Sequence, residues 1–153
     1  MPNWTYNLLV VEGEPDRVAD FVESARGVAG DGEPLELDFE RHVPTPPEVL
    51  VSDRWYAWRR QHWGTKWNAS DVVRDGSPEA GCVRYRFATA WRPPDAWLGA
   101  VSAVHPELDL RHEYVEELGH FAGRDHLRAG ELVVHEEIDP ATSGWWTDAA
   151  PSG

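Results

Sequence analysis

The sequence predicts a single α+β domain in which helices pack on one face of a β-sheet. Two strand-like stretches are each followed by apolar residues at helical spacing, and a further strand-like stretch follows each helix. The chain has 153 residues, which suits one domain whose core is large enough to need no disulfide. We expect this domain to span residues 1–138 and a C-terminal tail, held in place by Trp145 and Trp146, to occupy residues 139–153.

The first part of the chain predicts a β-α-β unit. Residues 6–11 form an apolar run that ends in valines, as in a central strand. Pro15 and its acidic neighbours favour the start of a helix, whose core-facing residues at helical spacing are Val18, Phe21, Val22 and Ala25. Apolar and acidic residues then alternate over 35–40, which predicts a half-exposed second strand.

The second part predicts another β-α-β unit. In residues 83–89, apolar side chains alternate with Arg84 and Arg86, so the apolar face is expected to be inside. A helix is expected from Pro93-Pro94-Asp95 to His105, with Trp97, Val101 and Val104 on one side. Strands at 108–115 and 132–138 are expected to pair side by side. This β-α-β-β-α-β order with an extra C-terminal strand predicts a ferredoxin-like sandwich, a name that describes topology and implies no iron.

Residues 44–81 are expected to form a long insertion between the second and third strands. The prolines at its start disfavour regular structure, and Asp53 is placed to cap a short helix. Between positions 54 and 92 there are eight basic and three acidic residues, whereas the rest of the chain has 6 basic and 24 acidic residues. Five of the nine tryptophans lie in the same segment. Arginine beside aromatic rings is typical of binding surfaces, although the rings can also build core while the arginines pair with the protein's own acids.

The candidate ligand-binding residues are Arg59, Trp63, Lys66, Trp67 and Glu116. Trp63 and Trp67 bracket the only lysine of the chain, and Gly64 permits a tight turn, so we expect Lys66 to lie against indole faces. An ammonium held in this way can bind a phosphate or a carboxylate. The alternative is structural, with Lys66 paired to Glu116 or Asp71 and the insertion fixed on the sheet.

Signals for other chemistries are weaker. The strand around Tyr85 faintly resembles the base-stacking strand of RNA-recognition domains, but its alternation places the aromatic rings inside. Imidazole and carboxylate groups together can bind metal, but the spacing of the histidines at 112, 120, 126 and 135 is not diagnostic, so we expect no metal site. No motif assigns catalytic residues, and no cofactor is expected.

Five short motifs occur in the order found in one known family. They are Asn3-Trp4-x-x-Asn7, Trp63-Gly64-Thr65-Lys66-Trp67-Asn68-Ala69, Phe87-x-Thr89-Ala90-Trp91-x-Pro93-Pro94, Tyr114-x-Glu116 and Phe121-Ala122-Gly123. Over residues 3–130 the chain resembles the YubB-like ferredoxin-like family of small bacterial, plasmid and phage proteins. Thr5 and Asn68 stand where many relatives have cysteine and aspartate, so redox or metal chemistry of that cysteine is not open to this chain. The family has no assigned biochemical role, and the resemblance therefore implies the fold alone.

The composition of the chain excludes several classes of protein. With 14 Lys and Arg against 27 Asp and Glu, the chain is too acidic for general binding to nucleic acid. One cysteine excludes a disulfide framework and a thiolate zinc site. No apolar run reaches the roughly 18 residues of a membrane helix, and the start of the chain lacks a signal peptide, so we expect a cytoplasmic protein with no membrane partner.

The sequence favours a non-catalytic binding module that recognises a protein partner or a small anion through the insertion. Two alternatives stay open. One is an uncharacterised enzyme whose pocket lies between insertion and sheet, with Lys66 and Glu116 as its polar groups. The other is binding of single-stranded nucleic acid by the basic segment, which the acidic balance of the chain disfavours. The oligomeric state is not encoded in any pattern of the sequence.

Overall fold

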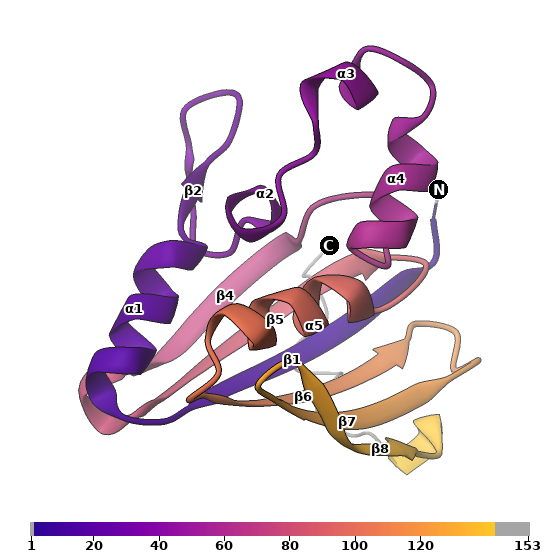
Figure 1. Ribbon diagram of the computed structural model, residues 1–153. Coiled ribbons are helices and arrows are strands. Elements are labelled where there is room, and N and C mark those ends of the chain that lie inside the picture. Colours follow the sequence, from indigo (N-terminus) through magenta and orange to yellow (C-terminus); the bar gives the residue numbers. More distant parts are fainter. Residues whose placement is uncertain (1, 143–153) are drawn as a thin grey trace.

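A six-stranded antiparallel sheet forms one layer of the molecule, and the helices lie on one of its faces (Figure 1). The computed structural model describes residues 2–142. The sheet has the order β4-β5-β1-β6-β7-β8, with bounds Ser70–Ser77, Cys82–Ala90, Trp4–Glu12, Asp109–Glu116, Ala122–Arg128 and Glu131–Glu137. The central strand β1 pairs with β5 and β6, and β4 pairs with β5. These four strands have the ferredoxin-like arrangement, so the predicted fold class is confirmed.

Two longer helices cover the middle of the sheet, as expected. Helix α1 spans Pro15–Ala25 and buries the four residues predicted from its spacing. Helix α5 spans Asp95–Val104 and buries Trp97 and Val101, but Val104 is 65% exposed. The buried face of α5 also includes Leu98 and Ser102. Its centre is therefore shifted away from Val104, which lies at the edge of that face. None of the described helices is long and apolar enough to cross a membrane.

The predicted second strand is wrong. Within 35–40 only Leu35 is in a strand, the two-residue β3 (Pro34–Leu35), which pairs with β2 (Gly27–Val28) in a separate hairpin. Phe39 begins the short helix α2 (Phe39–His42), whose first turn is capped by the Asp38 carboxylate through the Glu40 N–H at 3.0 Å. Leu37 and Phe39 are both buried although neither is in a strand, and their burial produces the alternation.

The second strand of the ferredoxin-like core is instead β4, which comes from the predicted insertion. The insertion therefore lies inside the first crossover, between α1 and β4, and carries α3 (Pro47–Leu50) and α4 (Trp55–His62). Helix α4 forms where a short helix was expected, but Asp53 does not cap it: Arg54 precedes the helix, and no side chain caps it there. Short 3-10 turns occur at Pro78–Ala80 and Pro140–Thr142.

The C-terminal part of the sheet also differs from the prediction. Strand β8 pairs with β7, and β7 separates it from β6, so the strands expected to be neighbours are not. Strand β7 buries Gly123 and Asp125 as well as Ala122 and Leu127, so its sequence shows no apolar alternation. The fold thus has two extra C-terminal strands. The prediction for Trp145 and Trp146 lies outside the described residues.

The core lies between the helices and the sheet, and it contains the rings that the sequence placed inside. Tyr85 and Phe87 are buried, so this strand offers no aromatic face for base stacking. The opposite face of the strand carries Arg84 and Arg86, and both guanidinium groups pair with Asp75.

Two histidines meet in the helical layer beside Phe21. The Nε2 atoms of His42 and His105 lie 3.2 Å apart, and Ser24 Oγ lies 3.1 Å from His42 Nε2. Two imidazolium rings at this distance would repel each other, so the contact requires that the rings are not both charged. Burial, followed by repulsion from His105 and Arg41, lowers the pKa of His42 to about 4. Burial also lowers the pKa of His105.

Acid is therefore expected to destabilise the fold between pH 6.5 and about 4. In this interval the unfolded chain binds a proton at His42 that the folded chain does not, so the free energy of unfolding falls as the pH falls. Because the ring is only partly buried, we expect a loss of about 1–2 kcal/mol. Urea unfolding at pH 7 and pH 4.5 measures it, and His42→Gln should lose less stability over the same interval. An equal loss in both proteins would contradict this account.

Candidate functional site

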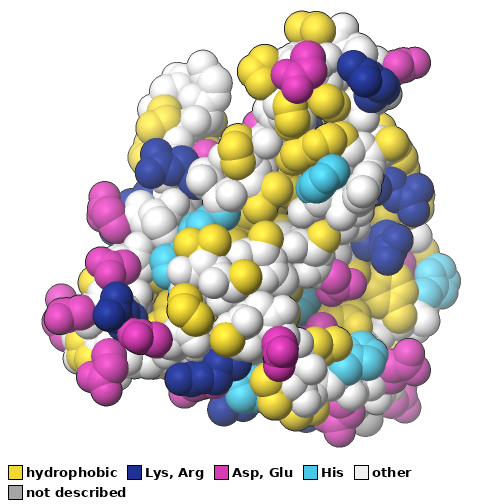
Figure 2. All heavy atoms as spheres, viewed as in Figure 1, with side chains coloured by type: hydrophobic (Ala, Val, Ile, Leu, Met, Phe, Trp, Pro, Cys, Tyr) yellow, Lys and Arg dark blue, Asp and Glu magenta, His cyan; other side chains and the backbone are white. Residues whose placement is uncertain are grey.

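The loop after α4 forms a small pocket with the end of β5 and the residues that follow it. Its volume is about 230 Å³, and its lining residues are Tyr56, Arg60, Gly64, Thr65, Lys66, Ala90, Trp91 and Arg92. We call it the cationic pocket. In Figure 2, dark blue Lys and Arg side chains lie beside and below the position that α4 occupies in Figure 1, and others are spread over the rest of this face.

The backbone around Gly64 holds the pocket in shape. Gly64 has a φ of +92°, and a Cβ atom there would lie 2.9 Å from the Asp95 nitrogen and 3.0 Å from the Pro93 oxygen. Only glycine permits so close an approach in this conformation. Next in the chain, the Thr65 hydroxyl donates a hydrogen bond to the Ala90 carbonyl at 2.7 Å. The loop is thereby fixed to β5 and to the start of α5, so the pocket does not depend on a ligand to form it.

Lys66 lies against aromatic rings, as its spacing predicts. Its Nζ atom is 4.2 Å from the centre of the Trp67 ring and 5.8 Å from that of Tyr56. The indole that contacts it is Trp67 alone, since Trp63 points into the core. Within the described residues Lys66 pairs with neither Glu116 nor Asp71, because no ion pair of the described part includes it. The ammonium group keeps its hydrogen-bonding capacity for a ligand.

Unpaired cations concentrate at this pocket. Most arginines of the chain form ion pairs with its carboxylates, for example Arg74 with Glu36 and Arg128 with Asp109. Within residues 2–142, the basic residues that form none are Arg41, Arg54, Arg60, Lys66 and Arg92. The last three of these line the cationic pocket. In an acidic chain, such a group creates a local positive potential that attracts anions.

Arg59 and Trp63 are structural and do not line the pocket. Trp63 is fully buried, and its Nε1 donates a hydrogen bond to the Val43 carbonyl at 2.8 Å. The Arg59 guanidinium lies 4.6 Å above the Trp63 ring and donates to Thr45 Oγ1 and to the Lys66 carbonyl. Burial lowers the pKa of Arg59, and the Glu40 carboxylate opposes this effect. Arg59 therefore connects α4 to other parts of the insertion. Its hydrogen bond to the Lys66 carbonyl supports the loop that forms the cationic pocket.

Glu116 is also separate from the pocket. It is the last residue of β6, and its Oε2 atom accepts hydrogen bonds from the backbone N–H groups of Leu118 and His120, each at 3.0 Å. These bonds close the turn that leads to β7. Because Glu116 does not line the cationic pocket, the structure does not bring it together with Lys66 as the polar pair of one site.

Sequence reasoning missed Tyr56, Arg60, Trp91 and Arg92 as members of the site. Tyr56 and Arg60 are four residues apart on α4, a spacing that places them on one helix face. Trp91 follows β5 with a φ of +68° and is 45% exposed. The only sequence signal for these residues was the excess of arginine and tryptophan over the whole segment.

The fold and the pocket define a ferredoxin-like α+β domain with a cationic surface pocket. Residues 62–143 match the family described as "Ferredoxin-like domain in Api92-like protein", and the chain belongs to this family. The crystal structure of the protein api92 from Yersinia pseudotuberculosis is similar, with a TM-score of 0.70 and 11% identity over 90% of this chain and 98% of that chain. No curated protein matches the sequence. The family thus has a ferredoxin-like fold and no known function, and the matches carry the Api92-like name and not the YubB-like one.

Proposed function

We propose that the protein is a non-catalytic binding module that recognises a small phosphate or carboxylate group in the cationic pocket. The observation that carries this proposal is the placement of Arg60, Lys66 and Arg92 around one preformed pocket, with no carboxylate paired to them in the described part of the chain. Guanidinium groups bind such anions through two parallel hydrogen bonds, and the ammonium adds a point charge.

The size and walls of the pocket support a small ligand group. At about 230 Å³ it lies below the range of roughly 300–1,000 Å³ that is typical of sites for drug-sized ligands. Tyr56 and Trp91 are exposed beside the cations, so an organic group attached to the anion could pack on their rings. A protein partner that presents a phosphate or carboxylate would be recognised by the same chemistry.

The lining of the pocket also favours binding over catalysis. It contains no histidine, the side chain that most often acts as a general acid or base, and no carboxylate. The enzyme hypothesis requires Glu116 as a polar group of the pocket, but this side chain accepts backbone hydrogen bonds in the turn after β6. These contacts support the binding module as the first hypothesis.

Replacing Lys66 with methionine should weaken the binding of inorganic pyrophosphate. Methionine keeps much of the contact with Trp67 but removes the charge, and a lost hydrogen bond to a charged group weakens binding by about tenfold or more. Titration calorimetry with phosphate and pyrophosphate measures the change. Arg54→Gln is the matched control, because it removes an unpaired cation of the same segment that does not line the pocket. Its affinity should equal that of the wild type.

Two results would contradict this assignment. Equal losses in the Lys66 and Arg54 variants would mean that net charge, and not the pocket, attracts the anion. Tighter binding of a short single-stranded oligonucleotide than of pyrophosphate, with a steep dependence on salt, would favour the nucleic-acid alternative.

A further inference from the structure

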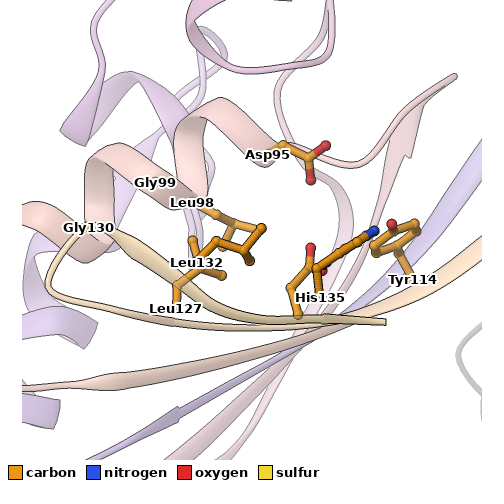
Figure 3. A pocket seen from close by; sticks show the side chains of 9 residues that line it. Asp95, Leu98, Gly99, Tyr114, Leu127, Gly130, Leu132 and His135 are labelled. Carbon is orange, nitrogen blue, oxygen red and sulfur yellow. The ribbon is translucent and has the colours of Figure 1, made fainter. Parts of the chain in front are cut away.

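A second group of polar side chains lies in a separate cavity between the start of α5 and strands β6–β8 (Figure 3). The cavity has a volume of about 350 Å³ and shares no lining residue with the cationic pocket. In Figure 3, Asp95 points down from α5 toward His135 and Tyr114, which rise from the sheet. Leu98, Leu127 and Leu132 form the apolar side of the same cavity.

At and beneath the wall of this cavity, three potential metal ligands converge from three elements. Asp95, His112 and Asp125 each offer one ligand atom, and these atoms all lie within 4.8 Å of one another. His112 and Asp125 are directly opposite each other in the pairing of β6 with β7, which places both side chains on the same face of the sheet. Asp95 comes from the first turn of α5, above that face.

The hydrogen bonds around His112 show which of its two ring nitrogens carries the hydrogen and which presents a lone pair. Asn7 Nδ2 donates to the Thr5 carbonyl at 3.1 Å and to Thr89 Oγ1 at 3.0 Å, which sets the orientation of the amide. Asn7 Oδ1 therefore faces His112 Nε2, at 2.9 Å, and accepts its hydrogen. In the neutral ring the proton is then on Nε2, and Nδ1 presents a lone pair.

That lone pair faces the carboxylate of Asp125. His112 is fully buried, and its Nδ1 atom has no hydrogen-bond partner in the described part of the chain. The nearest carboxylate oxygen, Asp125 Oδ2, is 3.9 Å away. Two acceptors that face each other in a buried site require a cation between them.

The distance favours a metal ion over a proton. A proton shared between nitrogen and oxygen would draw the two atoms to roughly 2.7–3.2 Å. Two ligands of one zinc ion, with bonds of about 2.0–2.2 Å in a tetrahedral site, are about 3.4 Å apart. The separation of 3.9 Å is closer to the second value. The ligand atom of Asp95 lies within 4.8 Å of the other two, and rotation of this exposed side chain would bring it nearer to them.

The hydrogen bonds around the cluster resemble those around metal sites. His135 Nδ1 lies 2.6 Å from Asp125 Oδ1, so this hydrogen bond orients the carboxylate, while Asn7 orients the imidazole. Such outer contacts are the rule around metal ligands in proteins. Of the other histidines considered from the sequence, His126 pairs with Asp109 and His120 with Glu116, so neither belongs to the cluster.

We propose that Asp95, His112 and Asp125 bind a divalent transition-metal ion. One imidazole nitrogen and two carboxylates suit zinc, manganese or iron(II), whereas calcium and magnesium prefer oxygen ligands throughout. Three protein ligands leave coordination positions for water or a small ligand, and Asp95 and Asp125 place them toward the cavity. This proposal departs from the expectation of no metal site, because the ligands come from elements that no sequence spacing connects.

Binding of zinc by the chelator-stripped protein tests the proposal. After gel filtration with added ZnCl₂, elemental analysis should find one zinc per wild-type chain, and the melting temperature should rise. Asp95→Asn should lose this zinc, and its exposed position makes it tolerant of the change. His135→Gln should bind zinc roughly 10- to 100-fold more weakly, as expected for a contact that orients a ligand.

Controls separate this site from unspecific binding and from the proposed function. His126→Gln removes another imidazole paired with a carboxylate at β6–β7 and should keep the zinc. Lys66→Met should also keep it, because it alters only the cationic pocket. The visible spectrum of bound cobalt(II) should change in Asp95→Asn and not in His126→Gln. Absence of zinc from the wild type, or equal binding by wild type and Asp95→Asn, would overturn the proposal.

Discussion

Replacing Trp63 with alanine is expected to lower the free energy of unfolding by about 3–5 kcal/mol, the range for large-to-small changes at buried aromatic residues. The side chain is fully buried, and its ring packs edge-on against Phe39 with centroids 5.6 Å apart. The substitution also removes the hydrogen bond to the Val43 carbonyl, which would leave that acceptor without its partner. Urea denaturation at neutral pH measures the loss.

Trp91→Ala is the control for this effect. Trp91 lies in the same basic segment and is 45% exposed, so its removal should cost about 1 kcal/mol or less. The two variants therefore distinguish a tryptophan that builds the core from one that borders a binding pocket. A loss of under about 1.5 kcal/mol for Trp63→Ala would contradict the structural role that the packing assigns to it.

The second large effect is expected at Asn7. Replacing it with leucine keeps a similar volume but leaves buried groups of His112 and Thr89 without their partners. Each buried polar group left unsatisfied costs about 1–3 kcal/mol, so the loss should be about 3 kcal/mol or more. The same urea titration measures it.

Thr89→Val provides the comparison for Asn7. It keeps the shape of a buried side chain in the same network but removes only the hydroxyl, which accepts from Asn7 and donates to the Arg92 carbonyl at 2.7 Å. We expect a loss smaller than that of Asn7→Leu. If Asn7→Leu were as stable as Thr89→Val, the amide would not be the centre of this network.

Elements with local signals were predicted well. The helix at Pro15–Ala25 follows from a proline in its first turn and an apolar stripe, and both act within the element itself. The strand at Cys82–Ala90 follows from period-two burial. The alternation at 35–40 failed as a guide because Leu37 and Phe39 enter the core from a bend and a helix start, and periodicity alone does not distinguish these.

The candidate sites show the same division between local and long-range information. Lys66 lies on Trp67 because the two are neighbours in the chain. The grouping of Lys66 with Arg92 depends on how the loop at Gly64 approaches Pro93 and Asp95, which is a tertiary contact. His112 meets Asp125 through strand register, and β7 itself was not predicted. Residues brought together by register or by loop contact carry no common spacing in the sequence.

Anion binding in the cationic pocket can be followed residue by residue by titrating isotope-labelled protein with pyrophosphate while recording its NMR spectrum. At 17.3 kDa the protein is suited to this measurement. We expect saturating shifts at the backbone amides of Thr65 and Lys66 and at the indole of Trp91, because all three residues line the pocket. Shifts that avoid these three residues, or that spread evenly over the exposed arginines, would contradict anion binding in this pocket.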